Sequence, residues 1–238
     1  MSNTPSNPKG TRDFLPSELS KRNYIIDILK KNFKNFGFSE IETPALEKNS
    51  TLLGKYGNEG DRLVFKILNS GEKVKKADIE ALKSNNLNSF TKSVSEKGLR
   101  YDLTVPLARY VAQHQNHLIF PFKRFQIQNV WRADRPQHGR FQEFTQCDAD
   151  VVGNNSIIQE IELIKLYDKV FTELGFDDLV FKINHRLILK GIGEYLGIAS
   201  NLNEFISIID KLDKIGIESV VNEIKDIFSN VSISKLEN

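Results

Sequence analysis

The stretch PFKRFQIQNVWRADRPQHGRFQEFTQCDADVV (121–152) decides the fold, because it contains two strand-like segments joined by a charged loop. We expect strands at 122–132 and 141–152, with the loop between them at 133–140. Side chains alternate between two faces along a strand, so each strand has an apolar face for the core and a face dense in polar groups. The polar faces carry Arg124, Gln126, Gln128 and Arg132 on the first strand, and Gln142, Phe144, Gln146, Asp148 and Asp150 on the second.

Two interpretations of this polar face compete. It can be a solvated face, as on many antiparallel sheets. It can also bind a ligand, which we favour because arginine forks and side-chain amides stand where a wet surface typically has Lys, Glu and Thr. Arg135 and Arg140 in the loop suit a polyphosphate, although a solvated basic turn has a similar composition. Neither GxxxxGKS/T nor GxGxxG occurs in the chain, so a common nucleotide-binding fold is not indicated.

The segments before this hairpin alternate between helix and strand. Apolar spacing predicts a helix that Ser17 caps and that runs to about Phe36. A strand at about 38–43 should end at Pro44, because proline cannot donate to a sheet ladder. Residues 62–76 are typical of a hairpin with a turn at Asn69-Ser70-Gly71.

The segment at about 75–97 is polar, and we expect a solvated insertion there. Strand signal returns at 99–103, and a helix should begin at about Thr104. After the central hairpin, a clear helix should end at Gly175. A strand at about 179–184 and two or three short helices should finish the chain. The expected buried face of the helix before Gly175 is Ile157, Ile161, Ile164, Tyr167, Phe171 and Leu174. This order predicts an α+β fold with an antiparallel sheet flanked by helices.

Bulk composition excludes several classes of protein. The formal net charge of +2 is too small to indicate a nucleic-acid partner by itself. The single cysteine, Cys147, lies on the apolar face of its strand, where we expect a packed thiol. The N-terminus lacks the apolar core of a signal peptide, and no apolar run approaches the ~20 residues of a membrane helix. We therefore expect a cytoplasmic protein without a membrane partner.

Several segments together carry a family resemblance. WRAD (131–134), a charged loop and the returning RFQEF (140–144) are similar to the second signature motif of class II aminoacyl-tRNA synthetases. The helix and strand at about 17–44 resemble the first motif, which implies a homodimer interface. The segments KGTRDFLP, RYDLTVP and RFQEFTQCDAD resemble histidyl-tRNA synthetase specifically. The resemblance implies an ATP-dependent ligase that joins histidine to tRNA(His).

The resemblance assigns two sets of residues. For ATP, it implies that Arg132 contacts the α-phosphate as the catalytic cation, while Arg140 reaches the terminal phosphates. Phe144 matches the aromatic that stacks on adenine, and Asp134 stands where the class usually has Glu near the adenine. For histidine, the implied contacts are Asp102, Thr104, Gln146 and Asp150. The first two of these match the pair that holds the α-amino group.

The expected organisation is a disordered lead at 1–8 and a partial class II catalytic domain at 9–238 with motifs 1 and 2. No segment resembles motif 3, the histidine-specific arginine segment or the anticodon-binding domain. We therefore expect a fragment that lacks full aminoacylation activity. Mg²⁺ should accompany ATP, with its ligands outside this chain, and we identify no metal ligands within it.

Two alternatives stay open. Synthetase-like paralogues serve as regulatory subunits of ATP phosphoribosyltransferase and bind histidine without ligating it. The joint presence of Arg132, Arg140, Gln146 and Asp150 argues against that function. The second alternative is a purely structural dimerisation module, which predicts that neither ATP nor histidine binds.

Overall fold

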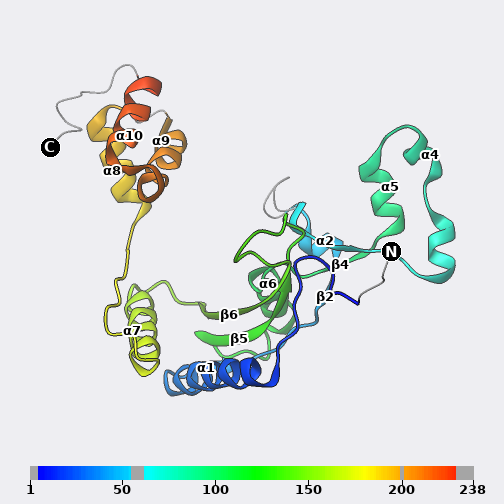
Figure 1. Cartoon of the computed structure of the whole chain (residues 1–238), viewed down its shortest axis with the longest axis horizontal. Coiled ribbons are helices and arrows are strands. Elements are labelled where there is room, and N and C mark those ends of the chain that lie inside the picture. The colour runs from blue at the N-terminus through cyan, green and yellow to red at the C-terminus, as the bar shows by residue number, and fades with distance from the viewer. Residues whose placement is uncertain (1–4, 55–61, 199–200, 229–238) are drawn as a thin grey trace. The chain divides into compact units, whose positions relative to one another are not determined.

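The computed structural model describes residues 5–54, 62–198 and 201–228, and its contacts divide the chain into units at 1–179 and 180–238. In the first unit, β5 (Phe122–Trp131) and β6 (Glu143–Val152) form a long antiparallel pair, as predicted. The short strand β1 (Ser39–Glu40) runs parallel to β5 and completes a three-stranded sheet in the order β1-β5-β6 (Figure 1). The expected strand after the first helix therefore exists, but only two of its residues pair.

Helices cover the apolar face of this sheet. The helices α1 (Pro16–Asn35) and α7 (Ile158–Glu173) pack against each other and against the sheet (Figure 1). Their shared core consists of Phe33, Phe38, Phe125, Leu166 and Val170. The opposite face of the same strands holds Arg124 and Gln126, both with no exposed surface. The alternation predicted from the sequence is therefore present, and both faces are covered at this point.

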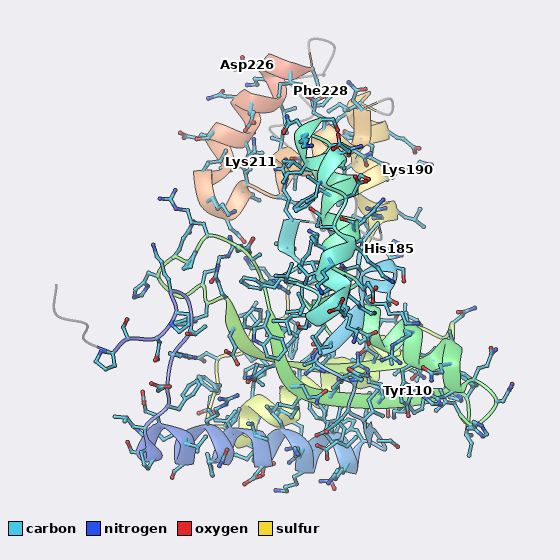
Figure 2. The ribbon with its side chains drawn as sticks, turned by 90° about the vertical axis from the view of Figure 1, so that its right-hand side faces the viewer. Tyr110, His185, Lys190, Lys211, Asp226 and Phe228 are labelled. Carbon is cyan, nitrogen blue, oxygen red and sulfur yellow. The ribbon has the colours of Figure 1, made fainter. Side chains whose placement is uncertain are left out.

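A second antiparallel sheet has the order β2-β4-β3 and comprises β2 (Leu46–Lys48), β3 (Lys66–Ile67) and β4 (Lys97–Leu99). The helices α2 (Asn49–Leu52) and α6 (Thr104–His114) lie beside it. Leu52, Val64, Tyr101 and Val105 form the core between them. On α6, Tyr110 stacks on Phe122 of β5 with ring centroids 6.3 Å apart, so α6 also contacts the first sheet (Figure 2).

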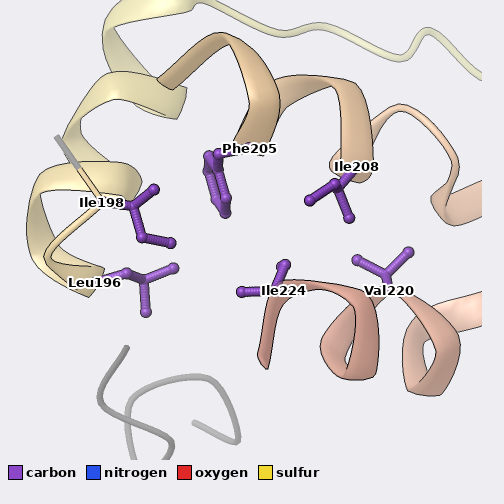
Figure 3. Close-up of a cluster of buried hydrophobic side chains, with 6 residues drawn as sticks. All are labelled: Leu196, Ile198, Phe205, Ile208, Val220 and Ile224. Atoms are coloured by element: carbon purple, nitrogen blue, oxygen red, sulfur yellow. The ribbon is translucent and has the colours of Figure 1, made fainter. Parts of the chain in front are cut away.

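The unit at 180–238 is helical, as expected for the end of the chain. It comprises α8 (Arg186–Leu196), α9 (Leu202–Ile209) and α10 (Leu212–Ile227). Their core consists of Leu196, Ile198, Phe205, Ile208, Val220 and Ile224 (Figure 3). Helix α8 ends at Gly197, whose φ of +80° favours glycine. Lys211, labelled in Figure 2, lies just before α10 and pairs with Glu223 of that helix.

Three predicted elements differ in the structure. Helix α1 begins at Pro16, with Leu15 rather than Ser17 at the cap, because the Glu18 carboxylate accepts the backbone N–H of Leu15 at 2.8 Å. The hairpin expected at 62–76 does not form, since β3 pairs with the distant β4 and the second arm is a 3-10 helix. No strand forms at 179–184, the segment that contains the boundary between the two units in the sequence.

The polar segment is helical rather than irregular. It contains the 3-10 helix η1 (Gly71–Lys76), α4 (Ile79–Lys83) and α5 (Leu87–Val94). Asp78 and Asn86 cap the two α-helices by accepting backbone N–H groups. Most of the segment's side chains are exposed, as expected for a surface excursion. Of the lead expected at 1–8, residues 1–4 lie outside the described part of the chain and 5–8 form no helix or strand.

The buried face of α7 matches the predicted one only in part. Leu166 and Val170, which were not predicted, are buried, and Leu163 and the predicted Leu174 pack beside them. Of the other predicted residues, Ile164 and Phe171 are half-buried. The remaining three are exposed, with exposed fractions of 73% at Ile157, 49% at Ile161 and 45% at Tyr167. The helix is apolar on two sides, and contact with α1 and the sheet decides which side is buried. The predicted end of the helix is confirmed, since Gly175 follows it with a φ of +86°.

Candidate functional site

The polar face of β5 and β6 is built by their antiparallel register. That register places Arg124 opposite Asp150, Gln126 opposite Asp148, and Gln128 opposite Gln146. The Arg124 guanidinium is fully buried and lies 2.6 Å from the Asp150 carboxylate and 4.0 Å from that of Asp148. A buried cation needs such partners, because an isolated charge in the interior is strongly unfavourable. The predicted face therefore contains a compact charged cluster rather than a wet surface.

Asp102 joins this cluster from the segment before α6. Its side chain is buried, and one carboxylate oxygen accepts the backbone N–H of Val105 at 3.3 Å. This bond satisfies a backbone donor in the first turn of α6, whose N-cap residue is Leu103, and Thr104 is exposed at the first position of the helix. Burial raises the pKa of Asp102, the negative charge of Asp148 adds to this effect, and Arg132 and Arg124 oppose it.

Gln146 and Asp150 lie on the same face of β6, as strand alternation predicted. The Gln146 amide donates to both carboxylate oxygens of Asp148, at 2.9 and 3.0 Å, and its own buried oxygen has no partner in the part of the chain that the structure describes. Burial raises the pKa of Asp150, while Arg124 lowers it and Asp148 raises it. Asp148 had no assigned function in the sequence analysis, yet it contacts two members of this cluster.

A second group of predicted residues lines one cavity of about 180 Å³. Its walls are Arg132, Asp134, Gly139, Arg140, Phe141 and Phe144. The Arg132 guanidinium lies 5.1 Å from the centroid of the Phe144 ring, and its Nε donates to the Tyr101 carbonyl at 3.0 Å. Arg140 lies 4.0 Å from Asp134 and keeps a largely exposed side chain. All four residues assigned to ATP therefore meet at the base of the loop between β5 and β6.

The segment 8–14 supports this cavity from outside, which the sequence analysis did not anticipate. The Gly10 carbonyl accepts the backbone N–H groups of Gln142 and Glu143 at 2.8 and 3.4 Å. The Arg12 guanidinium lies 4.2 Å from the ring centroid of Phe141, a wall of the cavity. Gln142 in turn donates to the Asp134 carbonyl at 2.9 Å. KGTRDFLP carried a family resemblance, but no local pattern indicated this contact.

A buried hydrogen-bond network centred on Arg100 lies beside the charged cluster of Arg124, Asp148 and Asp150. Arg100 is 2% exposed and donates to the Asn129 carbonyl, the Thr43 carbonyl and the Gln128 side chain. Gln126 donates to the Thr43 hydroxyl at 2.8 Å. The end of the first-motif strand is thereby joined to β5. The arginine of RYD was visible in the sequence, but its acceptors come from two distant segments, the end of the first-motif strand and β5.

The prediction that the Cys147 thiol is packed was wrong. Its side chain is exposed rather than packed, and it lines a cavity of about 560 Å³ between α1 and the apolar face of β5 and β6. Although the side chain is exposed, desolvation by its surroundings raises the pKa of the Cys147 thiol to about 12, with the charge of Asp148 adding to the effect. A thiol of this pKa is protonated at neutral pH and is therefore a poor nucleophile.

Two features are absent from the described residues 5–54, 62–198 and 201–228. Within these ranges no group of three or more His, Cys, Asp or Glu side chains could hold a metal ion. No helix in the same ranges is long and apolar enough to span a membrane.

Comparison with known proteins identifies relatives of this chain. The family profile described as histidyl-tRNA synthetase matches residues 82–233. A histidine–tRNA ligase of Christiangramia forsetii is 59% identical over 95% of this chain and 50% of its own length, and one of Bacteroides fragilis is 51% identical over 100% and 52%. The chain spans about half the length of the curated relatives it matches.

Solved structures show the same fold. The structure of histidyl-tRNA synthetase from Nostoc sp. has a TM-score of 0.76 and 31% identity, covering 98% of this chain and 47% of its own. An ATP phosphoribosyltransferase regulatory subunit/histidyl-tRNA synthetase from Bacillus halodurans has a TM-score of 0.72 at 22% identity, with coverage of 98% and 53%, and supports the fold alone. Since the family profile covers more than half of the sequence, the chain belongs to the histidyl-tRNA synthetase family.

Proposed function

We propose that the complete protein is a histidine–tRNA ligase, and that this chain contributes the binding surfaces for ATP and histidine. The single observation that carries the proposal is the continuity of the two sites along one face of β6. Phe144 lines the cavity, and Gln146, Asp148 and Asp150 follow on the same face. Alternate residues of a strand are ~7 Å apart, so a nucleotide and an amino acid bound side by side would meet near Gln146.

The ATP half uses the cavity at the base of the loop. Phe144 offers a ring face for the adenine, and stacking of this kind contributes about 1–3 kcal/mol. Arg132 would contact the α-phosphate, and Arg140, with its exposed side chain, would reach the terminal phosphates. Asp134 lies within 4.0 Å of Arg140 and would orient it or contact the adenine.

The histidine half uses the charged cluster. The buried carboxylate of Asp102 would bind the α-ammonium group, together with the exposed hydroxyl of Thr104 beside it. Gln146 and Asp150 would bind the remaining polar atoms of the substrate. The free oxygen of Gln146 is well suited to accept an N–H group, because a buried acceptor without a partner is costly.

In the proposed reaction, a carboxylate oxygen of histidine attacks the α-phosphorus of ATP. The bond from that phosphorus to the bridging oxygen breaks, and pyrophosphate leaves with the bonding electron pair. Arg132, anchored by the Tyr101 carbonyl, offsets the negative charge that develops on the α-phosphate oxygens. A preorganised cation of this kind contributes on the order of several kcal/mol to transition-state stabilisation. The histidyl group then passes to the terminal ribose of tRNA(His), with release of AMP.

The remaining proposals concern the surroundings of the reaction. Mg²⁺ would accompany ATP and neutralise phosphate charge, with its ligands outside this chain. A homodimer through about 17–44 is supported by apolar side chains that α1 leaves exposed, including Tyr24 at 62% and Ile25 at 44%. We place the reaction in the cytoplasm, where tRNA is charged for translation.

The test is histidine-dependent exchange of pyrophosphate into ATP by the complete open reading frame that encodes this chain. A ligase gives exchange that requires histidine, and Arg132→Ala should abolish it. A regulatory subunit would bind histidine, seen as a rise in Tm, without any exchange. A structural module would show neither a histidine-dependent nor an ATP-dependent rise in Tm. Either of the last two outcomes would overturn the proposal.

A further inference from the structure

The inference concerns Arg124, the fully buried cation beneath the histidine half of the site. Its guanidinium lies 2.6 Å from Asp150 and 4.0 Å from Asp148. It also donates to the Gln126 side chain at 3.4 Å and to the Leu103 carbonyl at 3.5 Å, one residue after Asp102. A single guanidinium therefore joins β5, β6 and the segment that leads into α6.

The charge balance of the cluster indicates an electrostatic function for Arg124 in addition to packing. Asp148 lies close enough to both Asp102 and Asp150 for their charges to interact, and Arg124 opposes all three carboxylates from within the protein. Arg124 offsets one of the three negative charges, and Arg132 acts on Asp102 from the ATP side. The surplus of negative charge that remains is suited to a substrate that arrives with an ammonium group.

We propose that Arg124 is a positioning residue for histidine activation, which holds the Asp150 carboxylate on the pocket face and keeps the cluster anionic without itself touching the substrate. The proposal rests on the proposed function. It assigns to Arg124 a task that neither Gln126 nor Gln128, its neighbours on the same face of β5, can perform, because neither of them carries a charge.

The proposal predicts the direction in which the pH dependence of kcat/KM for histidine should shift. Arg124 lowers the pKa of both Asp102 and Asp150, whereas Asp148 raises both. Since the ammonium group binds to ionised carboxylates, kcat/KM for histidine should fall as pH drops through their pKa values. Removing Arg124 should move this acid limb to higher pH, and removing the charge of Asp148 should move it to lower pH. Cys147 and Tyr167 also interact with these carboxylates but stay neutral in this range.

The experiment uses the complete open reading frame and histidine-dependent ATP–pyrophosphate exchange. Arg124→Met should raise KM for histidine by up to about a hundredfold, as expected when a binding group is misplaced by about 1 Å, and should leave KM for ATP within about threefold. Arg124→Lys keeps the charge and should restore part of the loss. The ionisation of histidine itself is common to all variants, so it cancels in the comparison.

Lys123→Met is the matched control. Lys123 is the adjacent residue of β5 on the opposite face, and its ammonium group pairs with Glu162 at 2.6 Å. The variant removes the same charge and also deprives a carboxylate of its partner, but away from the pocket. Its KM for histidine and its acid limb should match those of the wild-type protein.

Asp148→Asn decides the question if Arg124→Met fails to fold. It leaves Arg124 in place and should move the acid limb to lower pH. A folded Arg124→Met with an unchanged KM for histidine and an unchanged acid limb overturns the inference. A shift to higher pH in Asp148→Asn, or no shift, also overturns it. If the wild-type protein shows no histidine-dependent exchange, the proposed function itself fails, and the inference fails with it.

Discussion

Replacing Gly10 by alanine tests whether the segment at 8–14 holds the ATP-binding loop in place. Gly10 has a φ of +84°, where a side chain costs about 1–2 kcal/mol. A Cβ atom there would lie 2.8 Å from Cγ of Gln142 and 3.0 Å from Cγ of Pro136, so crowding adds about 1–3 kcal/mol. The combined strain of about 2–5 kcal/mol must be relieved by moving either the segment or the loop.

Movement of the loop should weaken ATP binding rather than histidine binding. The Gly10 carbonyl accepts from Gln142, which in turn donates to the carbonyl of Asp134 in the cavity wall. If about 1.4 kcal/mol of the strain reaches the loop, KM for ATP rises about tenfold. The assay is pyrophosphate exchange at varied ATP and varied histidine, with Tm measured on the same samples.

Gly175→Ala separates backbone strain from crowding. Gly175 has a φ of +86°, but nothing lies within 4 Å of the position a Cβ would take. This variant should lose about 1–2 kcal/mol of stability while KM for ATP stays unchanged. The reasoning is refuted if folded Gly10→Ala keeps the wild-type KM for ATP, or if Gly175→Ala raises it equally.

Three further outcomes are expected. Phe144→Leu should raise KM for ATP by about 5- to 150-fold, equivalent to a stacking energy of about 1–3 kcal/mol, and should leave KM for histidine nearly unchanged; an equal effect on both would contradict the assignment. Arg100→Met should lower the free energy of unfolding by about 3 kcal/mol, because Gln128 and buried carbonyls lose a donor. Chemical denaturation measures this value, and a free energy of unfolding unchanged from wild type would refute the prediction. Since the pKa of Cys147 is raised to about 12, its alkylation by iodoacetamide should be slow at pH 7 and should still accelerate above pH 10, and a rate that levels off near pH 9 would argue against it.

The central hairpin shows what local sequence determines. The alternation in 122–132 and 141–152 specified two strands and the membership of each face, because the period of a strand is a property of the backbone. The loop between them is short enough to make the strands antiparallel neighbours. Membership of one polar face was therefore predictable for Gln146 and Asp150, and motif resemblance added their possible functions.

Tertiary contacts decided the features that the pattern left open. Helix α7 is apolar on two sides, and only docking against α1 and the sheet selected Leu166 and Val170 for burial. Likewise β3 found its partner in the distant β4 rather than in the residues that follow it. Which side of a helix is buried, and which strand a short strand pairs with, depend on contacts with segments that are distant in the sequence.

In the charged cluster, too, local sequence determined some features and tertiary contacts determined others. The sequence by itself determined that two arginines, four glutamines and two aspartates would lie on the polar faces of the two strands. Only the folded chain decided that Arg124 would be buried against Asp150, that Asp102 would join them, and that Gly10 would contact the ATP-binding loop. The physical reason is that alternation is set within a few residues of backbone, whereas burial and charge compensation depend on groups that are far apart in the chain.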